Sequence, residues 1–316
     1  MTRVFLRLIV AATLALLSAC STAPLLPSGQ LRASDWVSFD GKVMPYRAWR
    51  PSTTEKPRAI VIAIHGLSGA SSDFWPLGEH LRQNGCITYA YELRGQGNDP
   101  ATGDRGDIAS AEVWQRDLAV FHKLIRRKHP RTPVFWYGES LGSLVATHTA
   151  AHRLRWSDPD GLILATPIAG LRMNLSGMQR WLLETAAALS PRTRYSLGEL
   201  AGVDESAIQV TSTTTHGSQM AKTPHHISAF SLRLLVSIGQ MIDQNPAAAA
   251  KLRMPVLLLA SPNDIISSAD QIQRFFSHIR SDDKKLLWYT RSHHLILHDV
   301  QRAEALRDVE RWLRSH

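Results

Sequence analysis

Short apolar runs alternate with amphipathic stretches along most of the chain. Six runs are aliphatic or β-branched on both faces and are bounded by proline or glycine: 59–64, 86–91, 133–137, 162–165, 255–260 and 285–289. Such runs are typical of buried parallel strands, which are covered on both faces. The stretches between them have the periodicity of helices packed on a sheet: 73–84, 110–129, 141–155, 269–279 and a last one from 300 to 313. The alternation predicts an α/β fold with a doubly wound, mostly parallel sheet.

One long segment interrupts this alternation. Residues 168–250 contain no convincing strand, and their apolar residues gather near the two ends of the segment. We interpret the segment as a helical insertion, which divides the sheet domain into 36–167 and 251–316. The sheet domain should open with a hairpin over 36–50, because this stretch contains an Asp-Gly pair.

The first twenty residues have the composition of an export signal. Arg3 and Arg7 give a basic start, residues 8–17 are apolar, and no acidic residue occurs before Asp35. This pattern is typical of a secretory signal peptide, and the apolar run is too short to span a bilayer stably.

The export signal ends in Leu17-Ser18-Ala19-Cys20, which resembles the bacterial lipobox. The resemblance implies cleavage after residue 19, lipidation of Cys20 and a tether over 20–35. Acyl chains on Cys20 would anchor the protein to a membrane, and a serine in the next position would favour the outer membrane, facing the periplasm. The alternative is an ordinary signal peptide with an incidental cysteine. Cleavage would leave 297 residues and lower the formal charge from +9 to +7.

Composition excludes several classes of protein. With 44% hydrophobic and 20% charged residues, the chain is neither disordered, nor collagen-like, nor a coiled coil. Two cysteines exclude a disulfide framework, and Cys86 reads as a small buried side chain. The basic stretch 122–131 is interpreted as a solvated face or as a contact with anionic head groups. No nucleic-acid-binding module is recognisable, and the sequence leaves the oligomeric state open.

One motif carries candidate chemistry: Gly138-Glu139-Ser140-Leu141-Gly142. It is a G-x-S-x-G motif between an expected strand and an expected helix, which is the context of a nucleophile elbow. Small residues are needed on both sides of such a tight turn, and Gly138 and Gly142 provide them. We therefore predict that Ser140 is a nucleophile; the alternative is a glycine-rich turn with an incidental serine.

An acyl-transfer nucleophile needs two backbone N–H groups that stabilise the developing oxyanion. One should come from Leu141, the residue after the nucleophile. The loop after the first parallel strand, His65-Gly66-Leu67-Ser68-Gly69, should supply the second through Leu67. His65 precedes the serine at a strand end, so we expect it to hold this loop by hydrogen bonds rather than act as a base.

These blocks resemble the α/β-hydrolase superfamily, and most closely its branch of monoacylglycerol lipases, lysophospholipases and serine aminopeptidases of type S33. The block Glu92-Leu93-Arg94-Gly95-Gln96-Gly97 departs from the branch pattern, which has Asp at the position of Glu92 and His at that of Gln96. The resemblance spans roughly 37–313 and is weakest across the insertion.

The resemblance implies an acid and a base after the late strands. Asp264 matches the family acid, while Asp243 and Asp270 are alternatives in expected helices. His294 matches the family base because an acid, Asp299, follows five positions later. The neighbouring histidines at 293 and 298 compete for the role. The order Ser, Asp, His is that of the α/β hydrolases.

The implied reaction is hydrolysis of an acyl ester through an acyl-enzyme, without a cofactor. The substrate class that the resemblance implies is a monoacylglycerol or lysophospholipid, with the insertion as a cap that binds acyl chains. The alternatives are a small-ester esterase, a proline-type aminopeptidase, a cap that merely buries its own core, and a non-catalytic lipoprotein scaffold. A zinc site at His294 and His298 is not expected, because no H-E-x-x-H motif accompanies them. His216, His225 and His226 are expected to be surface or partly buried residues of the insertion rather than ligands.

Overall fold

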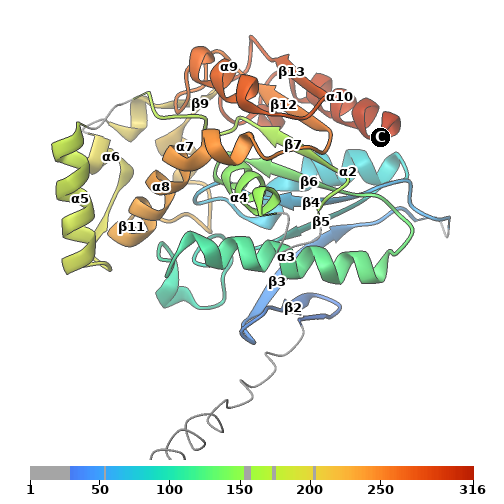
Figure 1. The fold of residues 1–316 in the computed structure, drawn as a ribbon, viewed down its shortest axis with the longest axis horizontal. Helices are drawn as coiled ribbons and strands as arrows, with labels where there is room; N and C mark the ends of the chain where they lie inside the picture. The colour runs from blue at the N-terminus through green and yellow to red at the C-terminus, as the bar shows by residue number, and fades with distance from the viewer. Residues whose placement is uncertain (1–28, 53–54, 153–157, 173–175, 202–203) are drawn as a thin grey trace, which may run out of the picture.

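The computed structural model describes residues 29–52, 55–152, 158–172, 176–201 and 204–316 (Figure 1). The expected signal peptide, Cys20 and most of the expected tether lie outside the described residues. Within the described ranges, no helix is both long and apolar enough to cross a membrane.

A nine-stranded sheet forms the centre of the protein, in the order β1-β2-β3-β5-β4-β6-β7-β12-β13. The six strands from β5 to β13 are mutually parallel and correspond to the six apolar runs, whereas β1, β2 and β3 are antiparallel. The bounds are β1 (Gln30–Leu31), β2 (Asp35–Val37), β3 (Val43–Trp49), β4 (Ile60–Ile64), β5 (Ile87–Tyr91), β6 (Val134–Glu139), β7 (Gly161–Ala165), β12 (Val256–Ala260) and β13 (Lys284–Trp288). The predicted doubly wound α/β fold is therefore confirmed.

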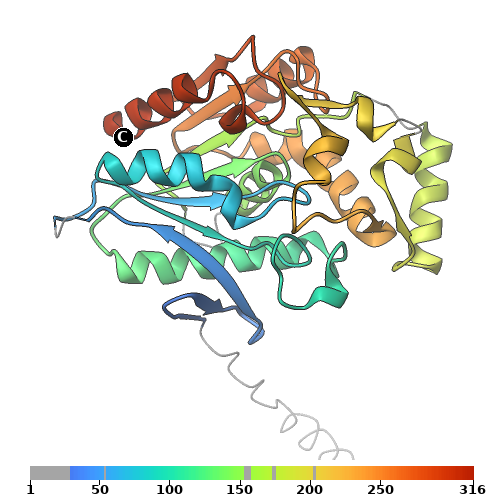
Figure 2. The same ribbon diagram turned by 180° about the vertical axis from the view of Figure 1, so that it is seen from behind.

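Helices cover both faces of the sheet (Figures 1 and 2). The helices and 3-10 turns of the sheet domain are η1 (Ser71–Phe74), α2 (Trp75–Gln83), η2 (Thr102–Asp104), α3 (Ala111–Lys128), α4 (Leu141–Ala151), α9 (Ala269–His278), η4 (Ile296–His298) and α10 (Arg302–Ser315). The side chains of β4 point alternately to the two faces and are apolar on both. Ile60, Ile62 and Ile64 pack toward α3, α4 and α9, whereas Val61 and Ala63 pack toward α2 and α10. Cys86 is a free, buried thiol between α2 and β5.

The insertion lies at one end of the molecule, between β7 and β12 in the chain (Figure 1). Its elements are α5 (Gly177–Leu189), β8 (Arg194–Tyr195), α6 (Leu197–Ala201), η3 (Glu205–Ala207), β9 (Gln209–Thr211), β10 (Thr214–Thr215), α7 (His216–Met220), β11 (Phe230–Ser231) and α8 (Leu232–Ala249). The expectation of an insertion without strands is not met, since β8 pairs with β11 and β9 pairs with β10. These strands have two or three residues each, too few to produce an alternating pattern in the sequence.

The end of the expected tether is also structured. Residues 30–31 form β1, which pairs with β2, and β2 begins at Asp35. A Cβ atom placed on Gly29 would overlap the side chain of Val120 on α3. The tether predicted over 20–35 thus ends earlier than expected, because its last residues pack on the sheet edge and α3.

Candidate active site

Ser140 lies at a tight turn between β6 and α4. Its backbone has φ 52° and ψ −116°, a conformation that few non-glycine residues adopt. A Cβ atom on Gly138 would lie 2.5 Å from the carbonyl oxygen of Gly142, and one on Gly142 would overlap the carbonyl of Ile64. The two glycines therefore permit the close approach of β6, α4 and β4 that holds Ser140 in this conformation.

Backbone strain is concentrated at this edge of the sheet. Among the described residues, the non-glycine residues with positive φ are Ser68 (59°), Ser140 (52°) and Thr166 (39°). They follow β4, β6 and β7, which are adjacent strands in the sheet. Each such residue costs about 1–3 kcal/mol, and such strain clusters at functional sites.

Asp264 and His294 are joined by a hydrogen bond. The Nδ1 atom of His294 lies 2.9 Å from Oδ2 of Asp264, and both residues are buried. The other carboxylate oxygen of Asp264 accepts the N–H of Ile266 at 2.7 Å. Of the competing acids, Asp243 lies in α8, where it pairs with Arg180. The structure brings together the acid and base that the resemblance implied.

The other two histidines of this loop have different surroundings. His293 has its Nδ1 atom 3.4 Å from Asp299, and His298 ends the 3-10 turn η4. For His294, burial alone would lower the pKa, but the charge and hydrogen bond of Asp264, with a smaller contribution from Glu139, raise it above its usual value.

The loop after β4 lies against Ser140. A Cβ atom on Gly66 would be 3.2 Å from Cβ of Ser140 and 3.8 Å from its Oγ. In the described part of the chain, the N–H of Leu67 donates to no backbone carbonyl. His65 holds this loop, because its Nδ1 lies 2.8 Å from the Gly66 carbonyl oxygen and its Nε2 accepts the N–H of Leu93 at 3.0 Å.

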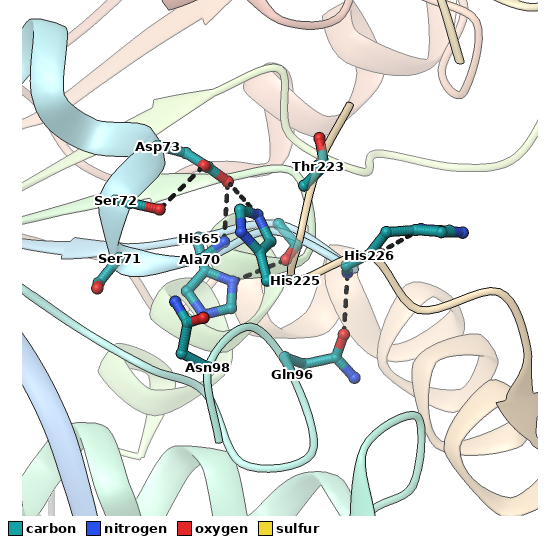
Figure 3. Close-up of polar contacts among 12 residues, drawn as sticks. His65, Ala70, Ser71, Ser72, Asp73, Gln96, Asn98, Thr223, His225 and His226 are labelled. Atoms are coloured by element: carbon teal, nitrogen blue, oxygen red, sulfur yellow. Dashed lines mark hydrogen bonds and ion pairs between the residues drawn. The ribbon is translucent and has the colours of Figure 1, made fainter. Parts of the chain in front are cut away.

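Ser68 connects this loop to the insertion. Its N–H donates to Oε1 of Gln96 at 2.9 Å, and its Oγ accepts the N–H of Ile227 at 2.9 Å and lies 3.3 Å from Nδ1 of His226. Figure 3 labels Gln96 and His226 of this group, on either side of the loop. Gln96, a departure from the branch pattern, therefore orients the N–H of Ser68. The sequence did not reveal the contact of Ser68 with the insertion, because His226 and Ile227 lie 158 and 159 residues after Ser68.

A second contact joins the insertion to η1. His225 is buried, and its Nε2 lies 3.5 Å from Oδ2 of Asp73 (Figure 3). The same oxygen accepts the N–H of Ala70 at 2.8 Å. Burial would raise the pKa of Asp73, but the bonds from His225 and Ala70 hold it below its usual value. His225 is thus buried, where the sequence indicated a surface or partly buried residue.

Glu92, the other departure from the branch pattern, supports the same region. Its carboxylate accepts the hydroxyl of Ser71 at 2.5 Å and the N–H of Asn98 at 3.2 Å. Burial would raise the pKa of Glu92, but hydrogen bonds and the nearby His65 lower it to about 2. Within the described residues, no group of three or more His, Cys, Asp or Glu side chains could hold a metal ion.

The strand order, the turn at Ser140 and the loops at the carboxyl edge of the sheet define an α/β hydrolase of the serine hydrolase class. The family model described as serine aminopeptidase, S33, matches residues 55–301, most of the chain. The chain belongs to this family.

Relatives and solved structures agree with this assignment. The chain is 23% identical over 286 residues to the monoglyceride lipase of Rattus norvegicus, covering 89% of each chain. It is 21% identical to the phospholipase YtpA of Bacillus subtilis, covering 80% of this chain and 94% of YtpA. The structure superposes with a TM-score of 0.76 on a soluble variant of the Saccharomyces cerevisiae monoglyceride lipase in complex with a substrate analogue, at 22% identity, covering 91% of this chain and 95% of that one.

Proposed function

We propose that the protein hydrolyses acyl esters, with Ser140 as nucleophile, His294 as general base and Asp264 as the acid that orients it. The observation that carries the proposal is the 2.9 Å bond between Asp264 and His294, on the edge of the sheet where Ser140 lies. This bond assigns the proton to Nδ1 and leaves Nε2 of His294 as the proton acceptor. The raised pKa of His294 reflects the same stabilisation of its protonated form.

The reaction proceeds in two halves. His294 removes the proton of Ser140 as the serine oxygen attacks the ester carbonyl, and the N–H groups of Leu67 and Leu141 stabilise the oxyanion. His294 then gives the proton to the leaving alcohol, and an acyl-enzyme remains. A water molecule deprotonated by His294 attacks the acyl-enzyme, and collapse of the second tetrahedral intermediate releases the carboxylic acid and restores Ser140. The reaction requires no cofactor.

The substrates we propose are monoacylglycerols or lysophospholipids. Two observations support this class: the chain is similar along most of its length to proteins named monoglyceride lipase and phospholipase, and the insertion exposes large apolar side chains on α5. Exposed apolar groups of this kind mark surfaces that bind lipids or partners.

The substitution Ser140→Ala tests the mechanism. We expect it to lower kcat by at least about 1,000-fold, since the remaining groups cannot form an acyl-enzyme. It should also abolish covalent labelling by a fluorophosphonate. Labelling that persists in the variant would refute the assignment of the nucleophile.

A chain-length series tests the substrate class. The purified protein is compared on p-nitrophenyl esters of graded length, long-chain monoacylglycerols, lysophospholipids and proline-terminated peptide amides. Equal or greater efficiency on short soluble esters would favour an esterase, and hydrolysis of the peptide amides alone would favour an aminopeptidase.

We also propose that the mature protein begins at Cys20 and is a lipoprotein anchored in the outer membrane, facing the periplasm. The sequence of residues 1–20 supports this location. In cells fed labelled palmitate, the protein should incorporate label and should sediment with outer membranes. Label that survives Cys20→Ser would overturn the lipid-anchor assignment.

A further inference from the structure

We propose that Asp299 is a positioning residue for His294, because it fixes the backbone beside this histidine by bonding it to Ser212 of the insertion. The inference rests on the proposed role of His294 as the base. It adds that a part of the insertion aligns the catalytic residues.

Both backbone N–H groups that flank His294 are engaged. The N–H of His293 donates to Oδ2 of Asp299 at 2.8 Å, and the N–H of Leu295 donates to the carbonyl oxygen of Val210 at 3.0 Å. Val210 belongs to β9 of the insertion. The backbone on each side of His294 is therefore held, one side by Asp299 and the other directly by the insertion.

The carboxylate of Asp299 joins these two sides. Its side chain is 1% exposed. Its Oδ1 accepts the hydroxyl of Ser212 and the N–H of Val300 at 2.7 Å, and both oxygens lie 3.0 Å from the N–H of Ser212. Burial would raise the pKa of Asp299, but the bonds from Ser212, Val300 and His293 hold it below its usual value. Asp299 is therefore an ionised acceptor at neutral pH.

Other residues of the sheet domain bond to the first part of the base loop. Asn263 donates to the carbonyl oxygens of Thr290 at 2.8 Å and Ser292 at 3.1 Å, and Gln301 accepts the N–H of Arg291 at 2.7 Å. These bonds act on residues 290–292, before the histidine. Asp264 holds the imidazole of His294, and Asp299 and β9 hold the backbone on its two sides. Asp299 is bonded to Ser212 and β9 is part of the insertion, so the backbone position depends on the insertion.

The substitution Asp299→Asn in the full-length protein tests this role. Asparagine replaces one acceptor oxygen by an NH₂ donor, so either the N–H of His293 or the hydroxyl of Ser212 loses its acceptor. We expect kcat on a soluble ester to fall about 10- to 100-fold with little change in KM, because misplacing a catalytic group weakens the transition state rather than substrate binding.

The partner Ser212 provides an independent variant. Ser212→Ala removes only the hydroxyl bond and should lower kcat less than Asp299→Asn, while Ser212→Thr should retain wild-type kcat. If Asp299→Asn does not fold, the pair of Ser212 variants decides the question. Equal kcat in Ser212→Ala, Ser212→Thr and wild type would then overturn the proposal.

Asp107→Asn is the matched control. Asp107 is also a buried acid that joins the sheet domain to the insertion, where it accepts the hydroxyl of Ser231 and Nε of Arg233, both at 2.6 Å. Its bonds are to the start of α8, not to the base loop. Its variant should lose stability but keep kcat within about twofold of wild type. A fall in kcat as large as that of Asp299→Asn would show a general loss of rigidity and would overturn the proposal.

Proton NMR gives a readout that needs no turnover. The Nδ1 proton of His294, bonded to Asp264, should give a downfield signal that is shifted or broadened in Asp299→Asn and unchanged in Asp107→Asn. An unchanged signal and unchanged kcat in folded Asp299→Asn would refute the positioning role. Wild-type activity in Ser140→Ala would instead refute the proposed function, and the NMR comparison would still decide the role of Asp299.

Discussion

The two halves of the insertion are built differently. Its second half bonds through residues 209–231 to the loop after β4, at Ser68, and to the loop that carries His294, at Asp299. In its first half, α5 exposes Met178, Trp181, Leu182 and Leu189 at 53–80% of their surface. The comparison shows that the insertion is not uniform, because the second half is fixed to the loop after β4 and to the His294 loop, whereas α5 in the first half presents an apolar face.

The contacts of α5 agree with this division. Only one described residue of the helix, Ala187, is buried, and an ion pair between Arg180 and Asp243 joins the helix to α8. Apolar side chains exposed next to one another cost free energy in water and are stabilised by contact with lipid. We therefore expect the fixed half to affect every substrate and α5 to affect only aggregated lipid substrates.

The larger effect should follow from Ser68→Ala. This substitution removes the acceptor of the Ile227 N–H and frees the loop that carries Leu67, so the oxyanion should be stabilised less well. Loss of an oxyanion-hole donor costs about 100- to 1,000-fold in kcat, and an indirect effect should be smaller, about 10-fold. Steady-state kinetics should show the decrease on both short esters and lipids.

Ser218→Ala is the control for this comparison. Ser218 also belongs to the fixed half, but its hydroxyl donates to the carbonyl oxygen of Thr215, the residue that caps the start of α7. Its variant should have wild-type kcat. Similar kcat values in the two alanine variants would mean that the contact between Ser68 and the insertion does not position the loop.

A smaller and more selective effect should follow from replacing both Trp181 and Leu182 by serine. The pair should contribute binding free energy only when α5 contacts a lipid surface, so kcat/KM on dispersed long-chain monoacylglycerols should fall about 3- to 10-fold. Hydrolysis of a soluble short-chain ester should be unchanged. Ala188→Ser, which alters an exposed small residue of the same helix, should behave as wild type. An equal loss on both substrates would remove the proposed difference between the two halves.

Local patterns were sufficient to predict the sheet. Five of the six strands are buried along their whole length, and only the edge strand β13 is partly exposed, so hydrophobicity marks these runs, and the observed strands begin and end within two residues of the predicted bounds. The turn at Ser140 was also predictable from a local pattern, because a strand, a G-x-S-x-G motif and a helix follow one another directly in the sequence. Asp264 and His294 required knowledge of a family pattern, since each lies among competing residues of the same type.

The contacts of the insertion were not predictable from the sequence. The hydroxyl of Ser212 meets Asp299 across 87 residues, and that of Ser68 meets Ile227 across 159. Ser212 lies in a run of serine and threonine in which no residue stands out. Such pairings are determined by the three-dimensional arrangement of the chain, and the local pattern of hydrophobic and polar residues does not indicate them.

The position of the insertion has a consequence for protein engineering. It lies within one crossover, between β7 and β12, which are hydrogen-bonded neighbours in the sheet. A replacement of α5 would leave the register of these strands intact, whereas a replacement of 209–231 would also have to reproduce the partners of Ser68 and Asp299. The exchangeable unit of this hydrolase is therefore smaller than the insertion, and its boundary falls inside the insertion, between α5 and β9.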